Sequence, residues 1–591
     1  MAKFSFHENT ANYLGNVREV DTRKVSIHVE DPDDLGKAQV GQLVIIPGSS
    51  GASHWIIGLI DRVIKSPSQM FMPTPEPLLQ ELADEEQDQL DIDNFIEKSL
   101  NTVKITLMGN IIYRPQTQNY QFSRSLDLLP DIDRKCYVLK NNDLEAFMGL
   151  ISNQSQQDKS LQLGIYQIDG KAKAFLDGDR LFQRHAAILG STGSGKSWTV
   201  ASILERSKEL PSTNIVVFDL HGEYQSLNYA KQLKIPGPEE LGLNQSELLF
   251  LPYWLLNSTE LQSLFVDSSE FTAHNQVMAF QNAVVSGKKT LLENNNQQQV
   301  LNAFTVDSPV PFDLQTVTKT LTELNEEMVQ GSRGLKQGTF FGQFNRLLAR
   351  IENRINDKRY GFLFQAPTTH NDYGALAKLV KNLIGHDIDD NLDIQHQIKV
   401  IDFSEVPSDI LPVIIALVAR LIYQIQFWTD HKLRQPLALV CDEAHLYLPR
   451  GELNPVEKRA VEAFEKIAKE GRKYGVSLLI VSQRPSDVSA TVLSQCNNVI
   501  ALRLTNADDQ NTVKKLLPES LDSLLDVLPI MNVGEALVVG DAVLLPSRIK
   551  ITEPTQKPLS ATINFWQCWQ QDPPIIDFER IVENMRRQSR K

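Results

Sequence analysis

A glycine-rich segment restricts the fold of this chain more than any other part of its sequence. Residues 190–197 read GSTGSGKS, after the apolar run AAIL and at the start of the helical pattern SWTVASILERS. Glycines let backbone N–H groups approach phosphate oxygens, and the N-terminus of the following helix favours the same anion. A strand, such a loop and a helix in this order predict an α/β fold that binds a nucleotide through its phosphates.

Two residues of this loop have separate predicted roles. Lys196 is expected to reach the β- and γ-phosphates of ATP, and the hydroxyl of Ser197 is expected to bind Mg²⁺. The predicted ATP-binding residues are Gly190, Ser191, Thr192, Gly193, Ser194, Gly195, Lys196 and Ser197. An ordinary glycine turn is the alternative, and the flanking strand and helix argue against it. ATP and Mg²⁺ are therefore the predicted cofactors.

Apolar strands alternate with helical patterns from about Gln183 onward. The candidate strands are AAILG, NIVVFDL, IKVIDFS, LALVCDE, VSLLIVSQ and NVIALRL, followed by EALVVG and AVLLPSRI. Continuous apolar runs of this kind are typical of a sheet covered on both faces. Ligands of such sheets bind at the carboxyl ends of the strands, so the polar residues there are candidate site residues.

Acids and an amide stand at three of these strand ends. Asp442 is expected to hold Mg²⁺ through water, and Glu443 to orient and deprotonate the attacking water. Gln483 is expected to hydrogen-bond the γ-phosphate or that water, with a simple strand-end cap as the alternative. Asp219 and Glu223, in DLHGEY, suit capping of the next helix as well as they suit catalysis.

Phosphoryl transfer also needs positive charge on the γ-phosphate, and two arginines are candidates for it. Arg472 follows the helix after Glu443 and precedes the strand that ends at Gln483. Arg184 lies twelve residues before Lys196. By spacing alone, a surface ion pair is the more common role for each of the two arginines.

The remainder of the 591 residues divides by pattern. Short alternating runs up to about Lys140 predict a small β-barrel. Residues 76–97 contain nine acids and neither lysine nor arginine, which favours a solvated insertion. The expected parts are a β domain with that insertion (1–160), a first core segment (161–254), a helical insertion (255–390), a second core segment (391–552) and a tail (553–591).

Charge and cysteine usage exclude several protein classes. The chain has 59 lysines and arginines against 73 acids, a net charge of −14, which excludes a uniformly basic coating protein but not a local basic channel. The four cysteines are far apart and form no CxxC, so neither a disulfide framework nor a zinc site is expected. The N-terminus lacks a signal peptide pattern and no run approaches 18 uncharged apolar residues. A cytoplasmic protein without a membrane span is predicted.

Taken together, RHAAILGSTGSGKS, FDLHGEY, LVCDEAH and EGRKYGVSLLIVSQRPSDV resemble HerA, of the HerA/FtsK group of hexameric DNA-translocating ATPases. GNVREVDTRKVSIHV and VGQLVIIPGS resemble the HAS-barrel that precedes the ATPase core in that family. The resemblance implies a RecA-like P-loop ATPase core with an N-terminal barrel and a helical insertion. It also implies a homohexamer that binds each ATP between neighbouring subunits.

The resemblance assigns roles residue by residue. It implies that Lys196 and Ser197 are the Walker A pair and that Asp442 and Glu443 are the Walker B acids. Gln483 matches the polar sensor. Arg472 resembles the arginine finger that contacts the ATP of the neighbouring subunit in that family, and Arg184 resembles a second basic contact. The tail from residue 554 to 591 resembles the segment that embraces the adjacent subunit.

The implied activity is hydrolysis of ATP to ADP and phosphate, which drives translocation or unwinding of double-stranded DNA together with a partner nuclease such as NurA. The alternative is an ATP-regulated assembly platform for a separate effector, sirtuin-like or nuclease, in bacterial antiviral defence. The sequence holds no second catalytic constellation, so an effector would be a separate polypeptide, docked on the N-terminal barrel. A GTPase is disfavoured because the chain has no NKxD motif.

Overall fold

A computed structural model describes residues 10–48, 54–66, 100–114, 119–156, 160–243, 245–332, 334–385, 387–388, 394–395, 397–518, 521–560 and 564–587. The acidic stretch predicted to be a solvated insertion, residues 76–97, lies outside the described residues. The chain divides into two compact units. The first comprises residues 1–181 and 498–552, and the second comprises residues 182–497 and 553–591.

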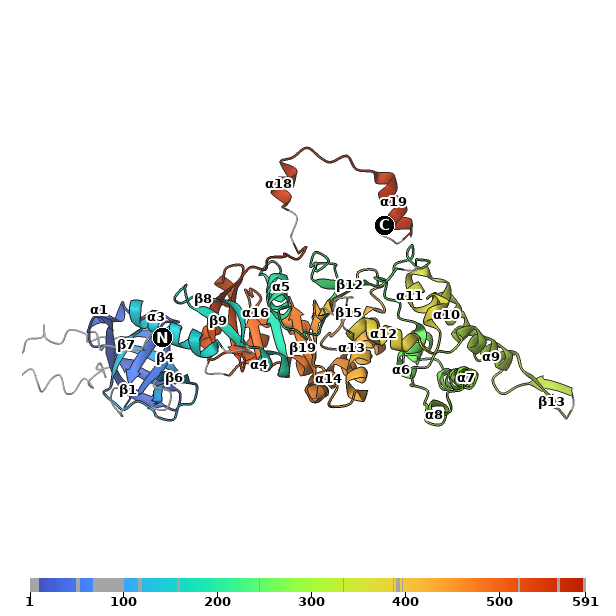
Figure 1. Cartoon of the computed structure of the whole chain (residues 1–591), viewed down its shortest axis with the longest axis horizontal. Coiled ribbons are helices and arrows are strands. Elements are labelled where there is room, and N and C mark those ends of the chain that lie inside the picture. The colour runs from blue at the N-terminus through green and yellow to red at the C-terminus, as the bar shows by residue number, and fades with distance from the viewer. Residues whose placement is uncertain are drawn as a thin grey trace, which may run out of the picture. The chain divides into compact units, whose positions relative to one another are not determined.

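Six of the described strands in the first unit close into a barrel, shown in blue in Figure 1. In barrel order they are β2 (Lys24–His28), β1 (Tyr13–Asp21), β7 (Lys135–Val138), β3 (Leu43–Pro47), β4 (His54–Ser66) and β5 (Leu100–Arg114). The antiparallel pairing of β2 with β5 closes the ring, and β6 (Asn119–Ser123) extends it from β5. The predicted small N-terminal barrel is thus confirmed.

Alternation and bulges make this closure work. Val25, Ile27 and Val29 alternate into the barrel core with at most 1% exposure, as residues on one face of a strand should. The β4–β5 ladder changes register after Ile57 and again after Ile60. Such bulges bend a strand and raise its twist, which is how a short sheet curls into a barrel.

The first unit also contains an antiparallel ladder. Its strands are β20 (Asn498–Ala501), β21 (Glu535–Gly540), β22 (Ser547–Ile551), β8 (Ser160–Tyr166) and β9 (Lys173–Asp177), in that order. Every pairing among these five strands is antiparallel. The helices of this unit are α1 (Pro32–Leu35), α3 (Asn141–Ser155), α16 (Ala507–Leu516) and α17 (Asp522–Leu525).

A parallel sheet forms the centre of the second unit. Its strands, in order, are β12 (Ala230–Lys234), β17 (Ile398–Asp402), β11 (Ile215–Asp219), β18 (Leu437–Cys441), β19 (Val476–Ser482) and β10 (Ala186–Leu189). Each neighbouring pair among the six is parallel, and every residue of β10, β11, β17, β18 and β19 is buried. The carboxyl ends of all six strands therefore meet at one edge. This arrangement confirms the predicted α/β core.

Three helices accompany this sheet: α5 (Lys196–Ser207), α13 (Leu411–Trp428) and α14 (Pro455–Glu470). Among the described helices, α13 is the one long and apolar enough to cross a membrane by composition. Twelve of its residues are nevertheless buried within the protein, and its Arg420 pairs with Glu260 at 2.7 Å. That burial is the ordinary pattern of a core helix in a large domain.

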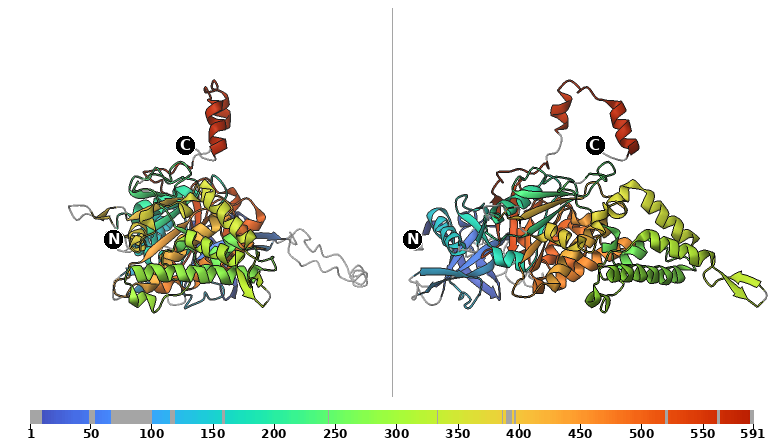
Figure 2. Two further views of the ribbon diagram at one scale, coloured as in Figure 1. Left: turned by 90° about the vertical axis from the view of Figure 1, so that its right-hand side faces the viewer. Right: turned by 45° about the vertical axis from the view of Figure 1, so that its right-hand side comes forward.

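The predicted helical insertion is present, in green and yellow in Figures 1 and 2. Its helices are α6 (Ser258–Phe265), α7 (Ala273–Asn294), α8 (Gln298–Leu301), α9 (Leu314–Glu326), α10 (Asn345–Asn356), α11 (Gly361–Phe364) and α12 (Ala375–Ile384). A hairpin of β13 (Met328–Gly331) and β14 (Gly334–Gln337) follows α9. Further described strands and α-helices are β15 (Asp387–Ile388), β16 (Ile394–Gln395), α4 (Gly178–Gln183), α15 (Ala490–Ser494), α18 (Phe565–Trp569) and α19 (Phe578–Arg587).

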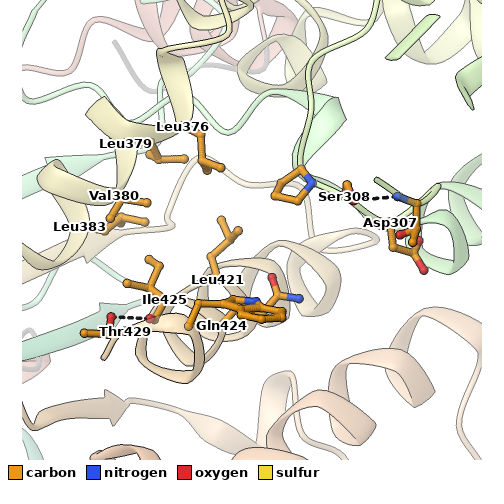
Figure 3. A pocket seen from close by; sticks show the side chains of 13 residues that line it. Asp307, Ser308, Leu376, Leu379, Val380, Leu383, Leu421, Gln424, Ile425 and Thr429 are labelled. Carbon is orange, nitrogen blue, oxygen red and sulfur yellow. Dashed lines mark hydrogen bonds between the residues drawn. The ribbon is translucent and has the colours of Figure 1, made fainter. Parts of the chain in front are cut away.

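A pocket of about 470 Å³ lies between α12, α13 and the loop 305–309. Figure 3 shows Leu376 and Leu379 of α12 facing Leu421 of α13 across it, with Ser308 at a third side. The loop is held by a buried lysine of α7, because Lys288 Nζ donates hydrogen bonds of 2.7 Å to two of its carbonyls, those of Val306 and Ser308. Lys288 therefore fixes one wall of the pocket.

We expect Lys288→Met to lower the free energy of unfolding by about 2 kcal/mol, because two partly buried carbonyls lose a donor while the apolar stem is kept. Burial lowers the pKa of Lys288 to about 8, below the 10.5 of an exposed lysine. The folded chain then binds fewer protons than the unfolded chain between these values, so wild-type stability rises with pH there. The loss caused by Lys288→Met should be larger at pH 9 than at pH 7 in denaturant titrations, and an equal loss at both would contradict this account.

Candidate active site

The glycine-rich loop forms a cradle at the start of α5. Gly193 and Gly195 have φ of +72° and +107°, a backbone region that residues other than glycine rarely adopt. Lys196 is 7% exposed and its Nζ donates to the carbonyl of Ser191 at 3.3 Å. The buried hydroxyl of Ser194 has no hydrogen-bond partner. A buried cation and an unsatisfied hydroxyl beside a helix N-terminus fit a phosphate group.

The two predicted acids follow β18 directly. Asp442 is 4% exposed, and burial raises its pKa well above the usual value, helped by the neighbouring carboxylates of Glu443 and Glu223. Glu443 adopts φ of +45°, which is uncommon for a residue with a side chain and is a form of strain that gathers at functional sites. Burial also raises the pKa of Glu443, while the charge of Lys196 lowers it.

The carboxylate of Glu443 is only partly paired. Its Oε2 lies 3.3 Å from Nδ1 of His445, at an angle that makes no hydrogen bond. The backbone N–H of Gln483 also faces the Glu443 carboxyl and lowers its pKa. A raised pKa and a carboxylate oxygen without a hydrogen bond are what a general base for water needs.

Gln483 meets the phosphate loop, as its position at the end of β19 predicts. The hydroxyl of Thr192 donates to Gln483 Oε1 at 2.5 Å. The N–H of Gly190 donates to the carbonyl of Ser482 at 3.2 Å, which ties the loop to the same strand end. Gln483 therefore lies where an amide can contact both the loop and a bound phosphate, and its role as a sensor stays a prediction.

The alternatives left open for Asp219 and Glu223 resolve differently for the two residues. Asp219 is fully buried and its carboxylate accepts four backbone N–H groups, those of residues 221–224. Burial raises its pKa to about 6 even against these bonds. Glu223 Oε2 instead accepts the hydroxyl of Ser197 at 2.7 Å. Asp219 thus shapes the turn, while Glu223 contacts the predicted metal ligand.

From the sequence, Glu223 stayed open between a capping role and a catalytic one, and in the structure its carboxylate contacts Ser197 of the predicted site. The carboxylates of Asp442, Glu443 and Glu223 all act on the pKa of Lys196, which burial lowers and these charges raise. Mg²⁺ prefers carboxylate, hydroxyl and phosphate oxygens, so the Asp442 carboxyl and the Ser197 hydroxyl are of the right chemistry to hold it beside a bound phosphate.

The two predicted arginines lie at the opposite edge of the sheet from this cluster. Arg472 precedes β19 and Arg184 precedes β10, so both stand at the amino ends of strands whose carboxyl ends carry the site. The seven residues of β19 extend about 20 Å at about 3.3 Å per residue. That length exceeds the reach of an arginine side chain, so Arg472 does not contact the phosphate loop of its own chain.

The segment around Arg472 is held firmly while its side chain is exposed. It forms a short 3-10 turn, η7 (Gly471–Tyr474). Tyr474 packs on Phe427 with ring centroids 5.0 Å apart, and Arg434 donates to the carbonyl of Lys473 at 3.4 Å. An exposed arginine on a fixed turn can serve a group that approaches from outside the subunit.

Two family models match this chain. "Helicase HerA, central domain" matches residues 161–422, and "Helicase HerA-like C-terminal" matches residues 415–552. Together they span residues 161–552, or 392 of 591 residues. All thirteen predicted site residues lie within that span.

Curated relatives agree with these matches. The chain is 27% identical over 393 residues to the DNA double-strand break repair helicase HerA of Sulfolobus acidocaldarius, which covers 65% of this chain and 68% of the relative. It is 26% identical over 453 residues to the protein of the same name from Saccharolobus solfataricus, covering 73% and 79%. Each of these relatives is similar over about two thirds or more of its own length.

Solved structures similar to the chain include VirB4 of Thermoanaerobacter pseudethanolicus, with a TM-score of 0.44 and 19% identity. That match covers 67% of this chain and 97% of VirB4. The bacterial conjugative coupling protein TrwB gives a TM-score of 0.43 and 13% identity, covering 70% and 92%.

Proposed function

Because the chain belongs to the HerA family of P-loop ATPases, we propose that it hydrolyses ATP to move along or unwind double-stranded DNA as a ring of six subunits. The observation that supports a ring is that the proposed ATPase residues of one subunit lie at two opposite edges of its sheet. The phosphate loop, Glu443 and Gln483 lie at the carboxyl edge, whereas Arg472 lies at the amino edge. A neighbour's arginine is needed to complete each site.

In this proposal each side chain has one task. Lys196 binds the β- and γ-phosphates, and Ser197 and Asp442 hold Mg²⁺, the latter through water. The metal, when bound, neutralises charge on the phosphates. Glu443 takes the proton of the attacking water and Gln483 holds that water in place. Arg472, with Arg184 as a second contact, places positive charge on the γ-phosphate of the neighbouring subunit.

The DNA part of the proposal rests on the relatives, which are repair helicases by name. Linear duplex DNA should raise ATP turnover of the wild-type protein. ATP should also drive displacement of the third strand from a DNA triplex, and Glu443→Gln should bind the same DNA without displacement. If duplex DNA does not change ATP turnover and the third strand is not displaced, a DNA motor is excluded and the assembly platform is favoured.

The C-terminal tail supports assembly. Its first part is fixed on its own subunit: Thr555 donates to Glu205 of α5 at 2.7 Å through its N–H, and Lys557 lies 4.6 Å from the ring centre of Trp198. Farther along, α19 exposes Phe578 and Ile581, at 69% and 46%. Apolar side chains at helical spacing call for a partner surface. We assign that surface to the adjacent subunit.

The N-terminal barrel is proposed to be a HAS-barrel that docks a separate effector in the cytoplasm, either a nuclease in DNA-end processing or a sirtuin-like or nuclease effector in antiviral defence. The barrel has its own core and contributes no predicted ATPase residue. Deletion of residues 1–156 removes it together with α3, whose Phe147 packs on Phe122 at 5.8 Å.

We expect this deletion to leave ATP turnover within about threefold of wild type, because the ATP site lies in the other unit. Association with the protein encoded by the adjacent reading frame should be lost in co-purification. If the deleted chain hydrolyses ATP and still binds that protein, the effector docks on the core or the tail instead.

A further inference from the structure

A buried histidine connects the two arginines at the amino edge of the sheet. His185 lies between Arg184 and β10, is 3% exposed and has φ of +52°. Outside glycine, such a backbone is uncommon, with histidine, asparagine and aspartate among the residues that adopt it most often. Its ring points into the protein while the neighbouring Arg184 is exposed.

The ring makes two hydrogen bonds that define its protonation. Nδ1 accepts the backbone N–H of Leu478 in β19 at 2.9 Å. Because Nδ1 is an acceptor, Nε2 carries the proton and donates to the carbonyl of Ala468 in α14 at 3.0 Å. The neutral ring is thus held between two segments that lie far from it in sequence.

These two segments, the end of α14 and the start of β19, flank the turn that carries Arg472. Ala468 lies four residues before Arg472, and Leu478 lies six residues after it. Arg472 is close enough that its charge acts on His185. The carbonyl of Arg184 in turn accepts the N–H of Asn497 at 3.1 Å. One imidazole therefore fixes both flanks of the Arg472 turn to the segment that carries Arg184.

We propose that His185 is a positioning residue which holds Arg184 and Arg472 in the geometry that they need to reach the ATP of a neighbouring subunit. This inference rests on the proposed function, in which those arginines act between subunits. His185 itself touches no nucleotide. Its contribution is to remove freedom from the arginine pair, because an error of about 1 Å in such groups costs on the order of a hundredfold in rate.

The test uses His185→Leu, which loses both hydrogen bonds, and His185→Asn, which tolerates the same backbone and keeps an amide acceptor for the Leu478 N–H. His185→Leu should lower kcat about a hundredfold with ATP affinity and KM within about threefold, because its own phosphate loop is intact. His185→Asn should recover at least tenfold of that loss. Lys288→Met serves as the control for lowered stability alone and should keep wild-type kcat.

Mixing separates positioning from general damage. A 1:1 mixture of His185→Leu with Lys196→Ala should regain turnover, because the Lys196→Ala subunit presents intact arginines to the intact loop of its neighbour. Loss of ATP binding in both His185 variants, or no gain on mixing once mixed assembly is verified, would overturn the inference. Arg472→Ala is measured beside them. If it abolishes turnover while His185→Leu does not, His185 has no positioning role; if Arg472→Ala retains turnover, the proposed function fails and this inference with it.

Discussion

Lys196→Ala and Glu443→Gln should both abolish ATP turnover, but for different reasons. Lys196 supplies charged hydrogen bonds to the phosphates, each with a contribution of about 1.5–3 kcal/mol, so its loss should weaken ATP binding by ten- to a hundredfold or more. Glu443→Gln keeps the shape of the site and removes the base, so ATP should bind and persist. Its kcat should fall by about 10²- to 10⁴-fold.

Binding of a fluorescent ATP analogue and phosphate release, measured on both variants, distinguish these effects. Glu462→Gln is the matched control, because Glu462 is an exposed glutamate of α14 that pairs with Arg459 at 2.9 Å. It should leave both binding and turnover unchanged. Full turnover by Glu443→Gln would show that another group activates the water.

Arg472→Ala should lower ATP turnover by about a thousandfold or more, since arginines that act between subunits contribute that much in related phosphoryl-transfer sites. Binding of ATP to a single subunit should change little, because Arg472 is separated from its own phosphate loop by the length of β19. Arg359→Ala, an exposed arginine of the insertion that pairs with Asp357 at 2.6 Å, is the control and should stay active.

Complementation decides whether Arg472 acts on a neighbour. In a 1:1 mixture of Arg472→Ala and Lys196→Ala, some sites pair an intact loop with an intact arginine, so part of the activity should return. Exchange of subunits is confirmed first, by co-elution of two differently tagged variants. An arginine that served its own subunit would show no such recovery, and that result would reassign Arg472 to a local structural role.

The core of the fold was predictable because its signals are local. Five of the six parallel strands are mainly apolar runs, and the polar residue that ends such a run marks the carboxyl edge, which is how Asp442 and Gln483 could be placed. The edge strand β12, AKQLK, lacks this signal and was not predicted. The barrel strands alternate in burial, as in β2, where Val25 and Ile27 are buried and their neighbours are partly exposed. These patterns depend on nearby residues, so they survive without knowledge of the tertiary partners.

Contacts between distant segments were not predictable in the same way. Glu223 follows β11, which is separated from β10 in the sheet by β18 and β19, yet its carboxylate accepts the Ser197 hydroxyl. His185 reads as an ordinary core residue until its ring is seen between Ala468 and Leu478. The hairpin inside the helical insertion follows from Gly331 and Gly334 at a turn, a signal available in the sequence that the helical spacing around it concealed.

If Arg472 acts on the ATP of a neighbouring subunit, as proposed, its separation from its own phosphate loop should leave an isolated subunit almost without ATP hydrolysis. Hydrolysis would then depend on subunit assembly. The rate of ATP hydrolysis per subunit should rise steeply with protein concentration and vanish on dilution below the dissociation constant of the assembly. A subunit without Arg472 would also inactivate the ATP site of its neighbour. A minority of such subunits should therefore have a dominant negative effect on ATP turnover. Under this proposal, the rate of ATP hydrolysis reports whether the ring has assembled, because the two halves of each site lie at opposite edges of the sheet.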